Sequence, residues 1–335
     1  MCSTAGRFVA PGLGSTTKTF TNALVLKAFD RGLLSPITKV VDIIPEFAGS
    51  SPFARAPKEK VSILHLFTHR GALAQTPWPV PPLEAGDFAE TIAAICEMPL
   101  VGEPGEKVYY SPCLSHALLG EIARRTLGEG RSFTRMLHEE LLDPLGMKDT
   151  SMGMRADRED RRVPVVPRLP KGEFFSPKDI TDTADAAWEG AEMPWVGCLS
   201  TADDIFTFTE MLRRGGEVGG ERILSPSAIA MATTLQTGGL VNERYASIVH
   251  RMHWDPWTAN IGLGFMMRGY GMHQTFFGLT ASPRTFGGYG AGSSQFWIDP
   301  ERDLTFVFLS AGVLGERDNL ERFQRLSDLA ISAAV

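Results

Sequence analysis

Residues 14–35, GSTTKTFTNALVLKAFDRGLLS, place a serine and a lysine three positions apart where an apolar helical pattern begins. The apolar residues recur at the spacing of one helix face: Phe20, Ala23, Leu24, Ala28 and Phe29. This periodicity predicts a helix from Ser15 to near Gly32. Positions i and i+3 share a helix face, so the Ser15 hydroxyl and the Lys18 amine can meet there.

A serine becomes a nucleophile when a base takes its proton, and a lysine can be that base only in its neutral form. Burial and the positive end of a helix both disfavour the ammonium form. Free N–H groups at a helix start can also stabilise an oxyanion. The spacing alone is weak evidence, because a chain of this length contains it about once by chance. An N-cap serine beside a solvated lysine is the alternative.

Composition and charge narrow the class of protein. Of the 335 residues, 43% are hydrophobic, as in an ordinary globular protein. The net charge of −6 argues against nucleic acid or an anionic membrane as partner. No apolar run could span a bilayer and the first residues have no signal core, so we expect a cytoplasmic protein. The four cysteines are scattered without a CxxC pair, so we expect neither a disulfide framework nor a zinc site. No other metal and no cofactor is expected.

Helical and strand patterns alternate along the rest of the chain. Helical patterns cover Phe88–Met98, Ser115–Leu127, Phe133–Leu142, Thr201–Arg213, Ser225–Ala232 and Asn319–Ala334. Gln295–Asp299 and Leu304–Ser310 read as two strands joined by a turn. Residues 155–195, rich in Pro, Asp, Glu and Arg, predict a long ordered loop. This order predicts an α/β domain assembled from both ends of the chain.

Six further segments follow the first in a fixed order. They are VSILHLFTHRGAL (61–73), EPGEKVYYSP (103–112), DPLGMKDTSM (143–152), STADDIFTFTEMLRRGGEVGGERILSP (200–226), IGLGFMM (261–267) and FGGYGAGSSQFWIDPERDLTFVFLS (286–310). Together with residues 14–35, they resemble the serine β-lactamase-related family of class C β-lactamases, DD-peptidases, family VIII esterases and fungal polyketide acyltransferases. The resemblance covers nearly the whole chain.

The resemblance implies an α/β fold of the α+β type, in which helices flank an antiparallel sheet and the site lies beside an inserted helical lobe. We expect residues 1–50 and 190–335 to form the α/β domain and residues 51–189 the lobe. Family members usually carry several tens of residues before the nucleophile, whereas 14 precede Ser15. We therefore expect a sheet without the usual N-terminal strands, and a homo-oligomer is one way to cover its exposed edge.

The same resemblance implies roles for individual residues. Ser15 matches the nucleophile, Lys18 its activating partner, and Tyr110 a phenol that relays protons and whose pKa neighbouring groups can lower. The alternative for Tyr110 is a core tyrosine. The backbone N–H groups of Ser15 and Ala291 would hold the oxyanion. The residues expected to bind substrate are Gly288, Tyr289, Gly290, Trp195 and Trp257.

The second and third motifs depart from the family pattern. Pro112 stands where an asparagine is usual, and Gly288 stands at the cationic position of the third motif. Both departures weigh against β-lactam hydrolysis, although Arg284 lies four residues earlier and is a possible substitute cation. Two histidine pairings are weaker candidates: Cys113 with His116 for a thiolate site, and His65 with His69 for a metal.

These features predict a serine hydrolase or acyltransferase of secondary metabolism. Its substrate would be an ester or lactone of a small, mostly apolar molecule, and the reaction would pass through a Ser15 acyl-enzyme. One alternative is a catalytically silent binding protein of the same fold. Another is a non-hydrolytic enzyme acting on a biosynthetic intermediate in the same pocket.

Overall fold

The main sheet has four antiparallel strands in the order β6–β7–β8–β9. The computed structural model describes residues 12–51, 57–76, 78–81, 84–291 and 293–334. The strands are β6 (Met266–Met267), β7 (Phe286–Gly290), β8 (Ser294–Asp299) and β9 (Leu304–Phe308). Gly288 pairs with Phe296, and Phe296 pairs with Val307. The two strands predicted from the sequence are therefore confirmed as β8 and β9.

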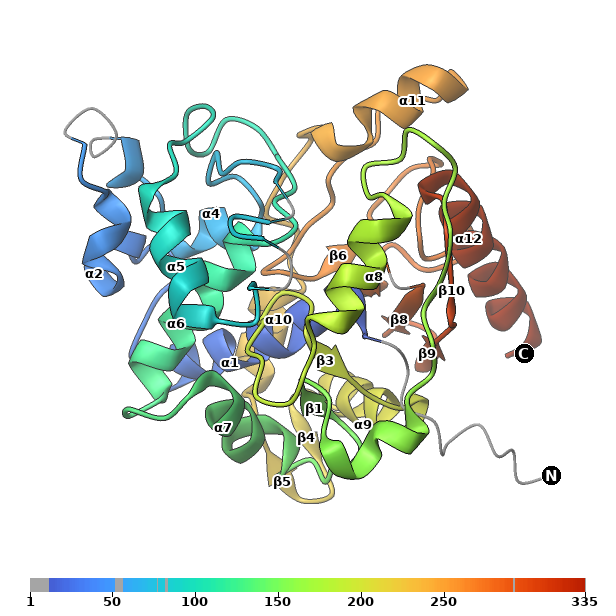
Figure 1. Ribbon diagram of the computed structural model, residues 1–335. Helices are drawn as coiled ribbons and strands as arrows, with labels where there is room; N and C mark the ends of the chain where they lie inside the picture. The colour runs from blue at the N-terminus through green and yellow to red at the C-terminus, as the bar shows by residue number, and fades with distance from the viewer. Residues whose placement is uncertain (1–11, 52–56, 77, 82–83, 292, 335) are drawn as a thin grey trace.

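Helices cover both faces of this sheet. Successive strand residues pack against different helices because they point to opposite sides of the sheet. Phe296 of β8 packs edge-on against Phe208 of α9 (Ala202–Arg213). The next residue, Trp297, donates from its indole nitrogen to Ser327 Oγ of α12 (Glu316–Ala333) at 2.9 Å. The predicted architecture, an antiparallel sheet flanked by helices, is confirmed (Figure 1).

Helix α1 (Lys18–Asp30) lies at the centre of the molecule, preceded by the 3-10 turn η2 (Gly14–Thr17). It packs against α6 (Leu114–Leu127) and also against α10 (Pro226–Ala232). Residues 18–26 are all buried, which is typical of a helix surrounded by protein on every side. Its N-terminal end meets β7, so the start of the helix lies at the junction of the helical region and the sheet.

The remaining elements are short. The helical ones are α2 (Val40–Ile43), η3 (Pro45–Ala48), α4 (Ile63–Phe67), α5 (Phe88–Glu97), α7 (Phe133–Leu137), the π-helical turn η4 (His138–Leu142), η5 (Ala156–Arg161), η6 (Glu243–Tyr245) and α11 (Ala246–Met252). The two-stranded pairs are β1 (Ser151–Met152) with β3 (Cys198–Leu199), and β4 (Glu217–Val218) with β5 (Glu221–Arg222).

Residues 155–195 contain more regular structure than the predicted loop. Strand β2 (Val166–Arg168) pairs in parallel with β10 (Gly312–Leu314), and helix α8 (Pro177–Asp185) follows. Helix α8 begins with a capping box in which Ser176 and Asp179 each accept the other's backbone N–H. This segment passes from the β10 edge to the helical region, in front of the other elements in Figure 1.

One hydrophobic core runs from the helical region through α1 into β7 and β8, and a second lies between the sheet and α12. The division at residues 51 and 189 remains a prediction. The chain ahead of Gly12 lies outside the described residues, and within them no strand pairs with the outer edge of β9. None of the described helices is long and apolar enough to cross a membrane.

Candidate active site

Ser15 lies in η2, and contacts from two other elements fix this turn in place. The backbone N–H of Leu13 donates to the carbonyl of Cys198 in β3 at 2.7 Å. Ser294 at the start of β8 donates to the Leu13 carbonyl at 2.6 Å, and its hydroxyl lies 2.8 Å from that of Thr16. No motif in the sequence pointed to this role of Ser294.

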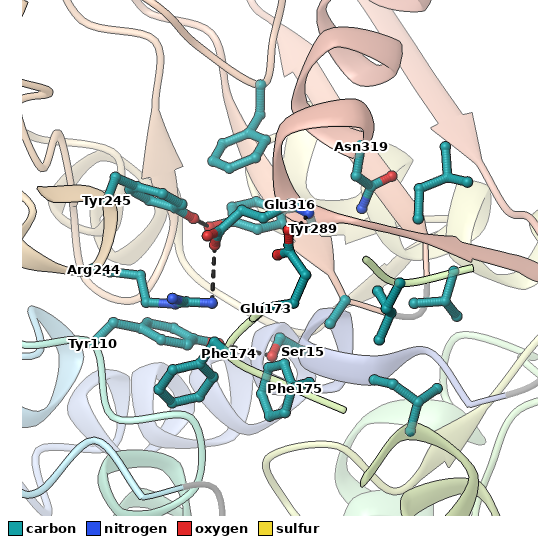
Figure 2. A pocket seen from close by; sticks show the side chains of 16 residues that line it. Ser15, Tyr110, Glu173, Phe174, Phe175, Arg244, Tyr245, Tyr289, Glu316 and Asn319 are labelled. Carbon is teal, nitrogen blue, oxygen red and sulfur yellow. Dashed lines mark hydrogen bonds and ion pairs between the residues drawn. The ribbon is translucent and has the colours of Figure 1, made fainter. Parts of the chain in front are cut away.

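The three residues predicted to act together meet at one point. Ser15 Oγ lies 2.8 Å from the hydroxyl of Tyr110 and 2.9 Å from Nζ of Lys18. The same Lys18 nitrogen donates to the carbonyl of Trp195 at 2.8 Å. Ser15 and Tyr110 are far apart in sequence, so the fold itself brings their hydroxyl groups together (Figure 2).

Burial shapes the protonation of Lys18. The lack of solvent around its amine lowers its pKa from 10.5 to about 7, against a weaker opposing effect of Cys113. Near neutral pH a large fraction of this lysine is therefore uncharged. An uncharged amine can donate to the Trp195 carbonyl while its lone pair accepts the Ser15 proton.

Tyr110 behaves differently from the expectation. Burial raises the pKa of its phenol, and the Ser15 hydroxyl and Arg244 oppose that rise only in part. Near neutral pH Tyr110 is a neutral phenol, which suits passing a proton on but does not suit acting as the primary base. The expectation of a lowered tyrosine pKa is wrong, because it underestimated desolvation.

His69 supports the segment that carries Tyr110. Its carbonyl accepts from Tyr109 N–H at 2.9 Å, its Nδ1 accepts from Ser111 N–H at 3.3 Å, and its ring centroid lies 4.7 Å from that of Tyr110. Burial lowers the pKa of His69 to about 3, so the imidazole is neutral and accepts through Nδ1. His69 is a positioning residue for Tyr110.

The other histidine and cysteine candidates show no sign of a thiolate site or a metal site. Burial raises the pKa of the Cys113 thiol, and His116 Nε2 hydrogen-bonds Asn22 Oδ1 at 3.0 Å. His65 Nδ1 accepts a long hydrogen bond from Ser62 N–H. Among the described residues, no three His, Cys, Asp or Glu side chains group as metal ligands.

Strand β7 comes very close to Ser15. A Cβ atom placed on Gly290 would lie 2.3 Å from the Leu13 carbonyl oxygen and 3.0 Å from the Ser15 nitrogen. Only a glycine allows this approach. Ala291 follows directly, and Ala291 and Ser15 line the same space.

Two cavities meet at Ser15 and Ala291. Phe175 and Ile180, from the segment that carries α8, line both. The first cavity combines charged, aromatic and aliphatic residues; its other lining residues are Tyr110, Leu169, Glu173, Phe174, Arg244, Tyr245, Phe276, Tyr289, Val313, Leu314, Glu316 and Asn319. The described residues that line the second are all uncharged and are mainly Trp78, Pro112, Val165, Ala184, Ala187, Trp195 and Val196.

The predicted substrate-binding residues divide into three groups. Tyr289 lines the first cavity and Trp195 the second. Gly288 and Gly290 line neither and act through close packing, since a Cβ on Gly288 would lie 2.9 Å from Thr19 Cγ2. Trp257 also lines neither cavity. It stacks on Tyr245, with 4.2 Å between the ring centroids, and belongs to the core between sheet and helices.

The cation that lines the first cavity belongs neither to the third motif nor to Arg284. Arg284 is exposed and lines neither cavity. Arg244 of η6 lines the first cavity and forms an ion pair with Glu316 at 2.9 Å (Figure 2). Sequence reasoning missed both residues, because η6 and the start of α12 belong to no motif that it used.

A serine hydroxyl that contacts a lysine one helical turn later and a tyrosine from a neighbouring loop can give up its proton and act as a nucleophile. The chain belongs to the Beta-lactamase family, which matches residues 10–330. This is a family of serine hydrolases and acyltransferases that share the β-lactamase fold.

Relatives and solved structures of similar fold cover most of this chain. Protein Rv1367c of Mycobacterium tuberculosis is 27% identical over 96% of this chain and 79% of its own length. The structure of a penicillin-binding protein homologue from Caulobacter crescentus superposes with a TM-score of 0.74 at 24% identity, covering 98% of this chain and 84% of that one. A family VIII carboxylesterase gives a TM-score of 0.71 at 22% identity, covering 96% and 84%.

Proposed function

We propose that this protein is a serine esterase or acyltransferase that takes the acyl group of a small, mostly apolar ester or lactone onto Ser15. The observation that carries the proposal is the contact of one hydroxyl, Ser15 Oγ, with both Lys18 and Tyr110 at 2.9 and 2.8 Å. One structure of the same fold is named a family VIII carboxylesterase.

In the proposed reaction, neutral Lys18 accepts the Ser15 proton while Ser15 Oγ forms a bond to the ester carbonyl carbon. The carbonyl oxygen takes up the negative charge and accepts hydrogen bonds from the Ser15 and Ala291 amides. The proton then passes through the Tyr110 hydroxyl to the leaving oxygen, and the carbon–oxygen bond to the alcohol breaks. Water or a second alcohol reverses these steps and releases the acyl group.

The residues that line the two cavities indicate where each half of the ester binds. Tyr110 lines only the first cavity, and the leaving oxygen must lie near Tyr110 to receive its proton. The alcohol therefore belongs in the first cavity. The acyl chain belongs in the second, whose lining of Trp78, Trp195 and small aliphatic residues is uncharged. Hydrolysis and acyl transfer differ only in which hydroxyl enters the first cavity after the alcohol leaves.

Two departures from the family pattern favour the silent-binding alternative. Pro112 borders the second cavity where an amide is usual, and Gly288 carries no cation. Against it stands the perturbed Lys18, because a buried amine with a pKa of about 7 has no evident purpose in a binding pocket.

Intact-mass spectrometry with a fluorophosphonate tests the proposal. We expect one adduct on the wild-type protein and none on Ser15→Ala, and we expect Ser15→Ala to lose turnover of p-nitrophenyl butyrate while its circular dichroism is unchanged. Folded wild-type protein that takes no label and turns over no ester would support the silent alternative.

A further inference from the structure

Arg244 is the cation that lines the first cavity, and its position is well fixed. It lies in η6, where Asn242 Oδ1 accepts its backbone N–H at 3.2 Å. The neighbouring Glu243 N–H donates to the carbonyl of Val108 at 3.2 Å, two residues before Tyr110. The turn that carries the guanidinium is thus attached to the segment that carries the tyrosine.

The guanidinium already has a carboxylate. Its Nη2 atom lies 2.9 Å from Glu316 Oε1, and it stands 4.2 Å from the ring centroid of Phe174. Within the described part of the chain, Glu316 is the only carboxylate that forms an ion pair with Arg244. Both side chains keep some exposure, 13% and 21%, so the pair faces the cavity without being sealed into the core.

Among the described residues that line the first cavity, Arg244 is the only cation, and Glu316 neutralises it. Glu173 lines the same cavity and accepts the Glu316 backbone N–H at 3.1 Å, which brings a second carboxylate beside the first. Burial and Glu173 raise the pKa of Glu316, and Arg244 and Arg251 oppose that rise. An anionic group entering here would meet a guanidinium that is already neutralised, next to another carboxylate.

We propose that Glu316 is a specificity-determining residue: by occupying Arg244, it makes the alcohol cavity select uncharged esters and reject those with a carboxylate on the alcohol side. This inference rests on the proposed function. A substrate carboxylate must either displace Glu316 or lie against Glu316 and Glu173, and both cost binding energy. Without Glu316, the same guanidinium becomes a carboxylate-binding site.

Two esters that differ only in charge test the inference. In 4-carboxyphenyl butyrate the alcohol half carries an anion, and in 4-carbamoylphenyl butyrate it carries a neutral amide of the same shape. The quantity measured is kcat/KM for the anionic ester divided by that for the neutral ester. Comparing this ratio among variants cancels the intrinsic reactivity of the two esters.

We expect Glu316→Gln to raise the ratio by about tenfold or more, the usual worth of a hydrogen bond to a charged group. Arg244→Gln should lower it, because Glu316 is then an unpaired anion, and the double variant should return it to near the wild-type value. Glu321→Gln is the matched control: it removes one carboxylate from the same helix, where Glu321 pairs with Arg317 on the exposed surface, and should leave the ratio unchanged.

An unchanged ratio in folded Glu316→Gln overturns the inference. So does a wild-type preference for the anionic ester that Arg244→Gln abolishes, because Arg244 would then bind substrate directly. If Glu316→Gln does not fold, the lower ratio expected for Arg244→Gln still tests the inference.

Calorimetric titration with 4-hydroxybenzoate and 4-hydroxybenzamide separates this inference from the proposed function. Tighter binding of the benzoate to Glu316→Gln than to wild type supports the inference even if neither ester is hydrolysed, in which case the proposed function alone fails. Equal binding to both proteins contradicts the inference.

Discussion

Lys18 Nζ lies 2.9 Å from Ser15 Oγ, one helical turn away, at the point where α1 begins. The same hydroxyl contacts Tyr110 at 2.8 Å, so it has two neighbours through which its proton can leave. Neither neighbour replaces the other: the amine has the lowered pKa of a base, and the phenol faces the alcohol cavity. The three groups should act as a unit.

The first prediction follows from that coupling. Lys18→Met and Tyr110→Phe should each lower kcat by roughly 10²-fold or more for p-nitrophenyl butyrate, the scale of acid–base groups. The double variant should be about as impaired as the worse single one. Tyr109→Phe is the control, since Tyr109 lines neither cavity, and it should stay active. If the losses of kcat add up in the double variant, Lys18 and Tyr110 act independently.

The second prediction concerns the pH dependence of activity. Lys18 must be neutral to accept the Ser15 proton, and burial sets its pKa at about 7. We expect kcat/KM to rise with pH through an apparent pKa near 7 and to fall about tenfold per pH unit below it. A rate profile that is flat from pH 5.5 to 8.5, measured with an ester stable over that range, would contradict Lys18 as the base.

The third prediction concerns stability. The folded pKa of Lys18, about 7, is depressed below 10.5, so between these values the unfolded chain holds a proton that the folded chain does not. The contribution of Lys18 to the free energy of unfolding is therefore fully present above 10.5 and is lost as pH falls through 7. Relative to Lys18→Met, the wild type should gain up to about 1.4 kcal/mol per pH unit from pH 7 upward.

Urea unfolding of both proteins at pH 7, 8 and 9 measures this difference. The comparison cancels the titration of all other groups, because the two chains differ at one side chain. A difference that does not change with pH would mean that Lys18 keeps an ordinary pKa in the folded protein.

Much of the fold could be predicted from local sequence patterns. The helix over residues 18–30 and the hairpin of β8 and β9 follow from periodicity and turn residues, which are short-range signals. The α8 segment was missed because residues 155–195 are dominated by polar and Pro residues. Its signal was nevertheless present, in the capping box at Ser176 and Asp179.

The candidate site could be predicted only where it rests on motifs. Ser15, Lys18 and Tyr110 lie in such motifs, and the fold brings them within hydrogen-bond distance. The pairing of Arg244 with Glu316 joins residues 72 positions apart in two segments without a recognisable pattern, so no local signal announces it. Trp257 shows the converse: a loop tryptophan in the sequence packs into the core behind Tyr245.

The fourth prediction tests the close approach of β7. Gly290→Ala would place a methyl group 2.3 Å from the Leu13 carbonyl and 3.0 Å from the Ser15 nitrogen. The strand must retreat, at a cost of about 1–3 kcal/mol, and the Ala291 amide retreats with it. We expect kcat/KM to fall by about tenfold or more, with a lowered melting temperature.

Gly102→Ala is the matched control for that substitution, because a Cβ there has nothing within 4 Å. It should change neither quantity. Full activity in Gly290→Ala would show that the distance between β7 and Ser15 is not critical for the reaction.

The last prediction is that the protein hydrolyses p-nitrophenyl butyrate with a higher kcat/KM than nitrocefin. A β-lactam of this kind carries a carboxylate that must find a cation near Ser15. Gly288 offers none, Arg284 is exposed away from both cavities, and Arg244 is held by Glu316. The loss of one charged hydrogen bond corresponds to about tenfold or more in binding. A neutral butyryl group needs no such partner and can occupy the uncharged cavity beside Trp195.

Both rates are measured on one preparation, with Ser15→Ala as the blank. If nitrocefin is the better substrate, a cation other than a free Arg244 must hold its carboxylate, or Glu316 must yield to it; Glu316→Gln and Arg244→Gln then distinguish these two explanations.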